Sequence, residues 1–283
     1  MSGFASRSAC LAVVAWACAA GSLAAQTSTL SLYDKFQVNL SLSGVILNSD
    51  IRIDGSEGSG TEVDAEDDLG LASVKLQPRG AFRWRPGRRH ELEIGYQFAE
   101  RTGEKVLERE VTIADSVYEV GATVKTTFNS NQAFFNYKFA FMAKDRTQVG
   151  AGIGLGALFF DFGVDLLADA GGATGEVSVA KSVTAPVGSL GLYGRFLVGD
   201  RWRFDVEPRV LLLEIDRFDI QVAELGGAIH YGLSEKLALE FGYASSWIKV
   251  EVAPEPVGNT DRIVSGEIKY SLQSIRLGLS YVL

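Results

Sequence analysis

Cysteine is almost absent from this chain of 283 residues, because Cys10 and Cys18 are its only two and both lie within the first 25 positions. Once that segment is removed, the remaining chain has no cysteine, which excludes disulfides, thiol catalysis and cysteine-based metal sites. Long apolar runs are absent as well. No stretch of about 18 apolar residues occurs and the mean hydropathy is only +0.11, which excludes a bundle of transmembrane helices.

Motifs of several enzyme classes are also missing. There is no glycine-rich phosphate loop between a strand and a helix, no zinc-ligand spacing and no Gly-x-Ser-x-Gly segment. The formal net charge is −8, and an acidic chain argues against nucleic acid as a partner. We therefore expect no catalytic residue, no cofactor, no metal and no binding to nucleic acid.

Residues 1–25 have the features of an export signal. Arg7 supplies the positive start, residues 9–20 the apolar centre, and residues 21–25 the small side chains of a cleavage zone. The apolar run is too short to anchor the chain in a membrane. We predict that residues 1–25 are a cleaved signal peptide and that residues 26–283 form one exported domain, with cleavage before Ala25 or Gln26.

The last strand shows the pattern that recurs along the rest of the chain. From Gln273 to Leu283, large apolar residues alternate with small or polar ones, so the apolar side chains fall on one face of an extended strand. Earlier segments, beginning with residues 36–46, alternate in the same way. A half-apolar strand needs partners on both edges, so we predict that the last strand pairs with the first and closes a barrel.

Short turns predict the register of the hairpins that they join. Around the turn at residues 87–89, Phe82 would face Ile94 and Arg83 would face Glu93, so apolar meets apolar and base meets acid. A slip by one residue would destroy both matches. The same test pairs Val198 with Trp202, Phe196 with Phe204 and Arg195 with Asp205, and it places Gly227 opposite Phe241.

The connections alternate between short and long. Short turns lie near residues 87, 145, 200 and 234, whereas 50–70, 101–125 and 167–181 are long polar segments. Short periplasmic turns, long external loops and an even number of strands are typical of outer-membrane barrels. We predict an all-β fold, a closed antiparallel up-and-down transmembrane barrel of ten strands. Eight strands is the alternative, through merging of the weaker segments near 216–231.

The face opposite the apolar side chains is charged. In a soluble sandwich or lipocalin-like barrel, these charges would face water and the Phe, Leu and Trp side chains would overfill the core. In a membrane barrel, the apolar face meets lipid and the polar face lines the lumen. The predicted lumen-lining network comprises Lys75, Arg79, Arg83, Arg85, Glu91, Glu93, Lys138, Arg195, Arg203, Asp205, Glu207, Arg209, Glu240 and Arg276, together with Glu224.

The export signal, the segment Asp64–Leu71, the hairpin Phe82–Leu92 and the alternating last strand resemble a broad group of proteobacterial outer-membrane β-barrel proteins of the OmpA/OmpW-like, porin type. The likeness covers nearly the whole chain after residue 25. It implies a location in the cell outer membrane and assembly by the barrel-assembly machinery through the last strand. Leu283 stands where such proteins usually end in an aromatic residue, and Tyr281 lies two positions before it. Most members have no assigned activity, so the resemblance implies fold and location.

A barrel of about eight to ten strands is narrow enough for side chains to fill. Buried charges must be paired, so we expect a salt-bridged, largely plugged lumen and a structural or surface-interaction role. A narrow channel for small solutes is the alternative, and an outer-membrane hydrolase is a third hypothesis; we expect no enzymatic activity. We expect a monomer whose partners are outer-membrane lipids and lipopolysaccharide.

Two further groups of residues are candidate sites. His90 and His230 are predicted to point inward near the short turns, as polar residues rather than as a catalytic pair at the outer rim. The acidic segment Asp64–Asp68 lacks the spacing of an EF-hand loop, so we expect it to be a solvated loop. Ca²⁺ binding is the alternative.

Overall fold

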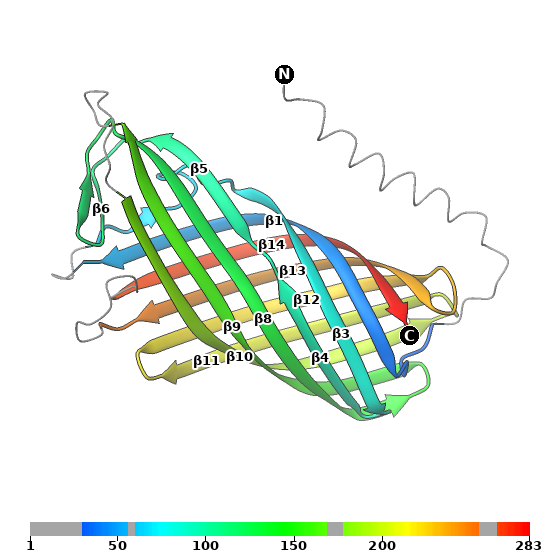
Figure 1. The fold of residues 1–283 in the computed structure, drawn as a ribbon. Helices are drawn as coiled ribbons and strands as arrows, with labels where there is room; N and C mark the ends of the chain where they lie inside the picture. Colours follow the sequence, from blue (N-terminus) through cyan, green and yellow to red (C-terminus); the bar gives the residue numbers. More distant parts are fainter. Residues whose placement is uncertain (1–29, 56–59, 169–177, 255–264) are drawn as a thin grey trace, which may run out of the picture.

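The computed structural model describes residues 30–55, 60–168, 178–254 and 265–283. The regular elements of this part of the chain are β-strands, and the long ones run obliquely side by side (Figure 1). No helix among the described residues is long and apolar enough to cross a membrane. The predicted signal peptide, residues 1–25, lies outside the described residues.

The strands follow one another along the chain with tight turns at one end. The described strands are β1 (Phe36–Asp54), β2 (Val63–Asp64), β3 (Val74–Gly87), β4 (His90–Gln97), β5 (Glu100–Val106), β6 (Val111–Ile113), β7 (Ser116–Tyr118), β8 (Thr123–Lys144), β9 (Thr147–Ala168), β10 (Ser178–Val198), β11 (Trp202–Ile215), β12 (Phe218–Gly232), β13 (Leu237–Val252) and β14 (Ser265–Val282).

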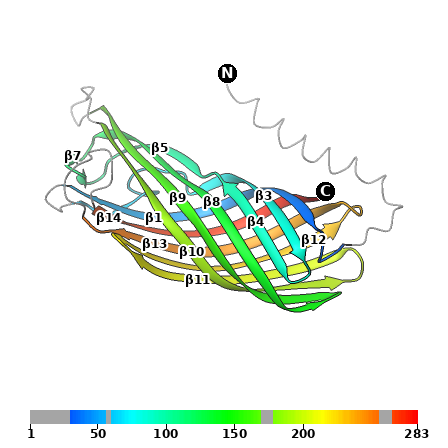
Figure 2. The same cartoon turned by 60° about the horizontal axis from the view of Figure 1, so that its bottom comes forward.

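Hydrogen bonds join the long strands into a ring. The antiparallel order is β1, β3, β4, β8 and then β9 to β14, and β5 continues the line of β4 along β8. β14 pairs with β1 over its whole length, from Gln37 opposite Val282 to Asp54 opposite Ser265. The predicted pairing of the last strand with the first is confirmed, in an all-β antiparallel sheet whose ring has about ten strands (Figure 2).

The predicted registers hold in two hairpins and fail in a third. Phe82 lies opposite Ile94 and Arg83 opposite Glu93, and the β10–β11 pairs are also as predicted. Gly227, however, lies opposite Tyr243 rather than Phe241, so that prediction was wrong. The turn after β12 lies one residue further along the chain than predicted, because Gly232 still pairs with Ala238 and the N–H groups of residues 233 and 234 both donate to the carbonyl of residue 237. The resulting shift is even and leaves each side chain on its predicted face.

Several strands are longer than a membrane requires. β8 and β9 have 22 residues each, roughly 70 Å at the usual rise, whereas a tilted span needs about 9–11 residues. The segment 167–181 was predicted to be a loop. β9 ends inside this segment, at Ala168, and β10 begins inside it, at Ser178. The polar segment 101–125 also contains β5 and the small hairpin β6–β7.

The ring has two halves of opposite character. Near the short turns, which we call the turn end, outward side chains such as Leu40 are apolar and exposed while inward ones such as Asn39 are polar and buried. Toward the other end, which we call the loop end, the inward side chains Ile51 and Phe160 are apolar while Asp161 faces outward and is exposed. The turn-end half thus has the side-chain distribution of a barrel in lipid, and the loop-end half that of a protein in water.

Candidate functional site

The interior of the turn-end half is filled by charged side chains centred on Glu91. This carboxylate, on β4, accepts from Arg195 of β10 at 2.5 and 2.7 Å, and its oxygens lie 2.6 Å from the Arg85 guanidinium and 3.2 Å from that of Arg83. Glu91 is 1% exposed and Arg195 is 3% exposed. Strand alternation places these groups inward, and the pairing of β4 beside β3 brings them to one level.

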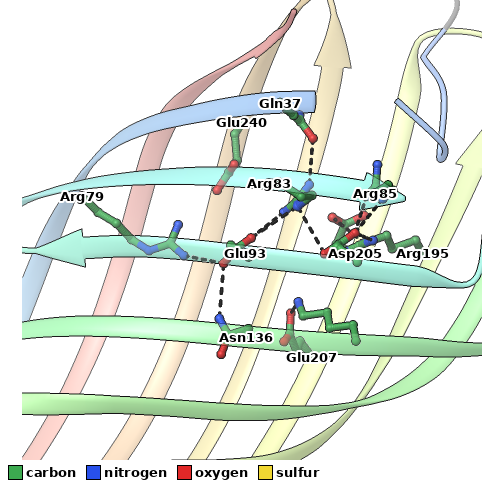
Figure 3. Close-up of polar contacts among 12 residues, drawn as sticks. Gln37, Arg79, Arg83, Arg85, Glu93, Asn136, Arg195, Asp205, Glu207 and Glu240 are labelled. Atoms are coloured by element: carbon green, nitrogen blue, oxygen red, sulfur yellow. Dashed lines mark hydrogen bonds and ion pairs between the residues drawn. The ribbon is translucent and has the colours of Figure 1, made fainter. Parts of the chain in front are cut away.

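A second carboxylate extends the network toward the loop end. Glu93 lies 3.0 Å from both Arg83 and Arg79, and Asn136 donates to it at 3.4 Å. Lys138 of β8 reaches across to Glu207 of β11 at 2.6 Å. Figure 3 shows these side chains converging from several strands on the inside of the wall.

The remaining predicted residues complete a layer across the ring. Asp205 binds Arg203 at 3.0 Å, and the imidazole of His230 lies 3.2 Å from the same carboxylate. Arg276 of β14 donates to Glu240 of β13 at 2.6 Å. Arg209 lies 2.6 Å from Glu207 and 3.7 Å from Glu224. We call the predicted lumen-lining residues other than Lys75 the ionic layer. Lys75 takes part in no ion pair among the described residues.

The ionic layer links strands that are far apart in sequence. Each carboxylate in it has at least one guanidinium or ammonium partner, so the cost of removing the charges from water is offset by ion pairs and hydrogen bonds. Removing one member of such a buried pair typically destabilises a protein by about 3–5 kcal/mol, because the other charge is left uncompensated. The layer therefore connects strands that are not neighbours in the ring, such as β4 with β10 and β8 with β11.

Small polar cavities remain beside the ionic layer. One of about 160 Å³ lies toward the loop end, lined by the side chains of Gln77, Asn136, Ser246 and Arg79 among others, and one of about 90 Å³ lies among the ions. Space of about 10–15 Å³ for a water-sized probe is enough for one water molecule, so each cavity has room for water.

The loop-end half contains an apolar core that sequence analysis did not predict. We call it the apolar plug. Wall residues such as Phe128 and Phe160, whose rings stack 5.9 Å apart, pack there against residues of the connecting segments, such as Leu69 and Val111. The signal was present in the sequence. From Leu158 onward, the inward-facing residues of β9 are apolar, and acidic residues occur among the outward-facing ones.

The hairpin β6–β7 spans the mouth above the plug. On one side, Ala114 donates its N–H to the carbonyl of Ile53 on β1 at 3.0 Å. On the far side, the Tyr118 hydroxyl donates to the carbonyl of Val164 on β9 at 3.2 Å. Burial raises the pKa of Tyr118 to about 12. This cap hairpin, visible at the end of the ring in Figure 1, covers the loop end of the interior.

The acidic segment has a structural role that differs from the predicted solvated loop. Residues 63–71, which we call the strap, fill the wall between the loop-end part of β1 and β5. Glu66 accepts from the backbone N–H of Ser49 at 2.8 Å and pairs with the buried Arg101 of β5. Asp68 pairs with Arg109 at 2.5 Å, and that hydrogen bond lowers the pKa of the Asp68 carboxyl. The prediction of a solvated loop was therefore wrong for Glu66.

No group of three or more His, Cys, Asp or Glu side chains in the described ranges is arranged to hold a metal ion. In the strap, the Asp64 carboxylate accepts from the backbone N–H groups of residues 66 and 67 at 2.9 and 2.6 Å. Both bonds are accepted by Oδ1, which is thus used to form the turn.

The chain before β1 crosses the turn end of the ring. The N–H of Leu30 donates to the carbonyl of Asp200 in the β10–β11 turn, across the ring from β1. The Tyr33 hydroxyl donates to the carbonyl of Lys144, the last residue of β8. Between them, Leu32 is 0% exposed. This crossing segment, residues 30–35, lies over the turn-end side of the ionic layer.

The two histidines differ in position. His230 is inward, as predicted, and buried between Asp205 and Glu240. His90 is exposed and lies against Tyr137, whose hydroxyl is 2.8 Å from its Nδ1, so the prediction that it points inward was wrong. Since Glu91 points inward, strand alternation turns its neighbour His90 outward.

Comparison with known proteins identifies the fold. No family model matches the chain, and no curated protein matches it. The outer membrane protease OmpT from Escherichia coli is similar in structure, with a TM-score of 0.57 and 12% identity over 91% of this chain and 100% of that one. The outer membrane protein AlkL (TM-score 0.36, 14% identity, 90% of this chain and 93% of that one) and the Ail protein of Yersinia pestis (0.33, 10%, 87% and 99%) are more distant. At this identity the likeness to OmpT shows a common fold, that of outer-membrane β-barrels.

Proposed function

We propose that this chain is a closed, ten-stranded transmembrane β-barrel of the outer membrane whose interior is shut, and that its role is structural or one of surface interaction. The observation that supports this most strongly is the succession of obstructions along the axis. The crossing segment covers the turn end, the ionic layer fills the turn-end half, and the apolar plug with its cap hairpin fills the loop-end half.

The membrane location is supported by the outer surface. Outward residues of the turn-end half include Trp84, Phe139, Trp202 and Phe241, each 38% or more exposed to solvent in the isolated chain. So broad an exposed apolar band is stable only against lipid. Every strand of the ring has partners on both edges there, as hydrocarbon requires. We place the turn end in the periplasm, following the predicted export of the chain.

Planar-bilayer recording tests the closed interior. The purified protein should show no steady conductance, because ions would have to cross the ionic layer and the apolar plug. A variant in which residues 108–121 are replaced by two glycines removes the cap hairpin but keeps the ionic layer, and it should conduct little more. Adding Glu91→Ser and Arg195→Ser to that variant should raise conductance. Steady channels in the unaltered protein would contradict the proposal.

A narrow channel for small solutes is the second candidate, favoured by the polar cavities beside the ionic layer. Under this alternative the cap hairpin would have to move, and conductance would rise sharply on its removal alone. The absence of enzymatic activity is part of the main proposal. It is supported by the positions of both histidines, which lie in the turn-end half, and peptide and lipid hydrolysis assays of the same preparation test it.

A further inference from the structure

The rim at the turn end carries an excess of positive charge. Its seven bases are Lys35, Arg88, Arg89, Lys144, Arg146, Arg201 and Lys236. Its four acids are Asp34, Asp145, Asp200 and Glu235. We call this set the basic rim.

Two of these bases are neutralised by neighbours in the rim. Arg88 lies 2.6 Å from Asp145, and Arg146 lies 3.2 Å from Asp200. In contrast, the exposed side chains of Lys35, Arg89, Lys144 and Lys236 have no carboxylate partner among the described residues. The excess charge is therefore available to a ligand outside the chain.

Aromatic side chains lie just inside the basic rim on the lipid-facing surface. Trp84 and Trp202 are exposed on β3 and β11, and Arg201 donates to the hydroxyl of Tyr231 at 3.2 Å. Tryptophan and tyrosine prefer the level of the lipid headgroups, and long basic side chains reach from that level toward the phosphates. The sequence Arg201–Trp202 places a cation directly beside such an anchor.

The loop end has the opposite sign. Residues 62–68 contain five acids and no base, and residues 108–119 contain four acids and one base. The chain is therefore polarised along the barrel axis, with a basic rim at one membrane surface and an acidic surface beyond the other. Anions are attracted to the first and repelled from the second.

We propose that the basic rim binds anionic phospholipid headgroups, such as phosphatidylglycerol, in the leaflet at the turn end. This inference rests on the proposed transmembrane location. The charge of the rim is complementary to a phosphodiester, and its height above the aromatic side chains matches the headgroup region. Each basic side chain near an anionic surface favours association about fivefold, so several together select anionic over zwitterionic lipids.

Quenching of tryptophan fluorescence by brominated lipids measures this selection at each end. In the full chain with Trp16→Phe and Trp247→Phe, the remaining Trp84 and Trp202 report on the turn end. With Trp16→Phe, Trp84→Phe and Trp202→Phe, Trp247 reports on the lipid-facing surface nearer the loop end. Vesicles of phosphatidylcholine with increasing brominated phosphatidylglycerol give the relative association constant of the two lipids at each position.

We expect phosphatidylglycerol to be favoured about fivefold or more at Trp84 and Trp202, and not at Trp247. The preference should disappear in 1 M salt, where the Debye length is only about 3 Å. It should also disappear in the variant Arg89→Gln, Lys144→Gln, Lys236→Gln. The matched variant Lys125→Gln, Lys249→Gln, Lys269→Gln removes three lysines of the loop end and should keep the preference.

Equal preference at both ends, or a preference that survives the rim variant, would overturn the inference. Failure of the proposed membrane location gives a different result, because brominated phosphatidylcholine alone would then leave all three tryptophans unquenched. Quenching by brominated phosphatidylcholine without selection for phosphatidylglycerol would therefore contradict only the lipid-binding inference, whereas absence of quenching would contradict the membrane location.

Discussion

Glu66 shows how much a single side chain can change the role of a segment. It lies in a run of five acids that, by composition, belongs in water, yet its carboxylate joins Ser49 of β1 to Arg101 of β5. Arg101 is 2% exposed and its guanidinium also lies 5.0 Å from the centre of the Phe128 ring. Asp68, two positions further on, instead pairs with Arg109 at the surface.

These two pairs predict a contrast within one segment. Arg101→Met should destabilise the protein by about 3–5 kcal/mol, because it leaves the buried carboxylate of Glu66 without a partner. Arg109→Met should cost no more than about 1 kcal/mol, since its pair with Asp68 is solvent-exposed. Urea unfolding of each variant in micelles measures both, and equal losses would contradict the assigned roles.

At the scale of elements, the strap and β5 meet at two glycines. Gly70 has a φ of +70°, a conformation that favours glycine, and its carbonyl carbon and oxygen lie against the α-carbon of Gly103 in β5. A side chain at Gly103 would overlap that backbone. The wall between β1 and β5 is thus closed by packing of backbone on backbone, which leaves no room for even a methyl group.

Gly103→Ala should therefore displace the strap. Its Cβ would lie 2.1 Å from the carbonyl oxygen of Gly70, which cannot move without moving the strap. We expect faster proteolytic cleavage within residues 60–73 and a lower free energy of unfolding. The control is Gly87→Ala in the β3–β4 hairpin, where an added Cβ meets nothing within 4 Å. If both variants resist proteolysis like the unaltered protein, the close contact is not needed.

At the scale of the whole molecule, stability depends on the ring being complete. The pairing of β1 with β14 joins the two ends of the sheet, and the ionic layer and the apolar plug then connect its walls across the interior. In hydrocarbon each unpaired backbone group costs several kcal/mol, so loss of one strand exposes two edges at once.

Deletion of residues 265–283 should abolish folding into membranes. The variant should lose the shift in gel mobility between heated and unheated samples that a stable barrel shows in detergent. Replacement of residues 108–121 by two glycines is the comparison, because it removes the cap hairpin and leaves every strand of the ring. That variant should keep the shift, and a truncated chain that also keeps it would show that β14 is dispensable.

The sequence alone determined which face of each strand is apolar and which strands are joined by short turns. These features are local: alternation with a period of two assigns a side chain to a face, and matched pairs such as Arg83 with Glu93 align a hairpin. Gly227 was misplaced because the position of its turn depends on backbone hydrogen bonds that composition does not reveal.

Only the tertiary structure decided how the interior is filled. The partners of Glu91 come from β3 and β10, and the apolar plug combines connecting segments with strands on opposite sides of the ring. Such contacts join residues a hundred or more positions apart, as with Glu91 and Arg195 or Ile51 and Ile268, and no local pattern states which of them meet. Closure of the ring brings them together, because it fixes the distance between facing walls and so determines which charged and apolar side chains can touch.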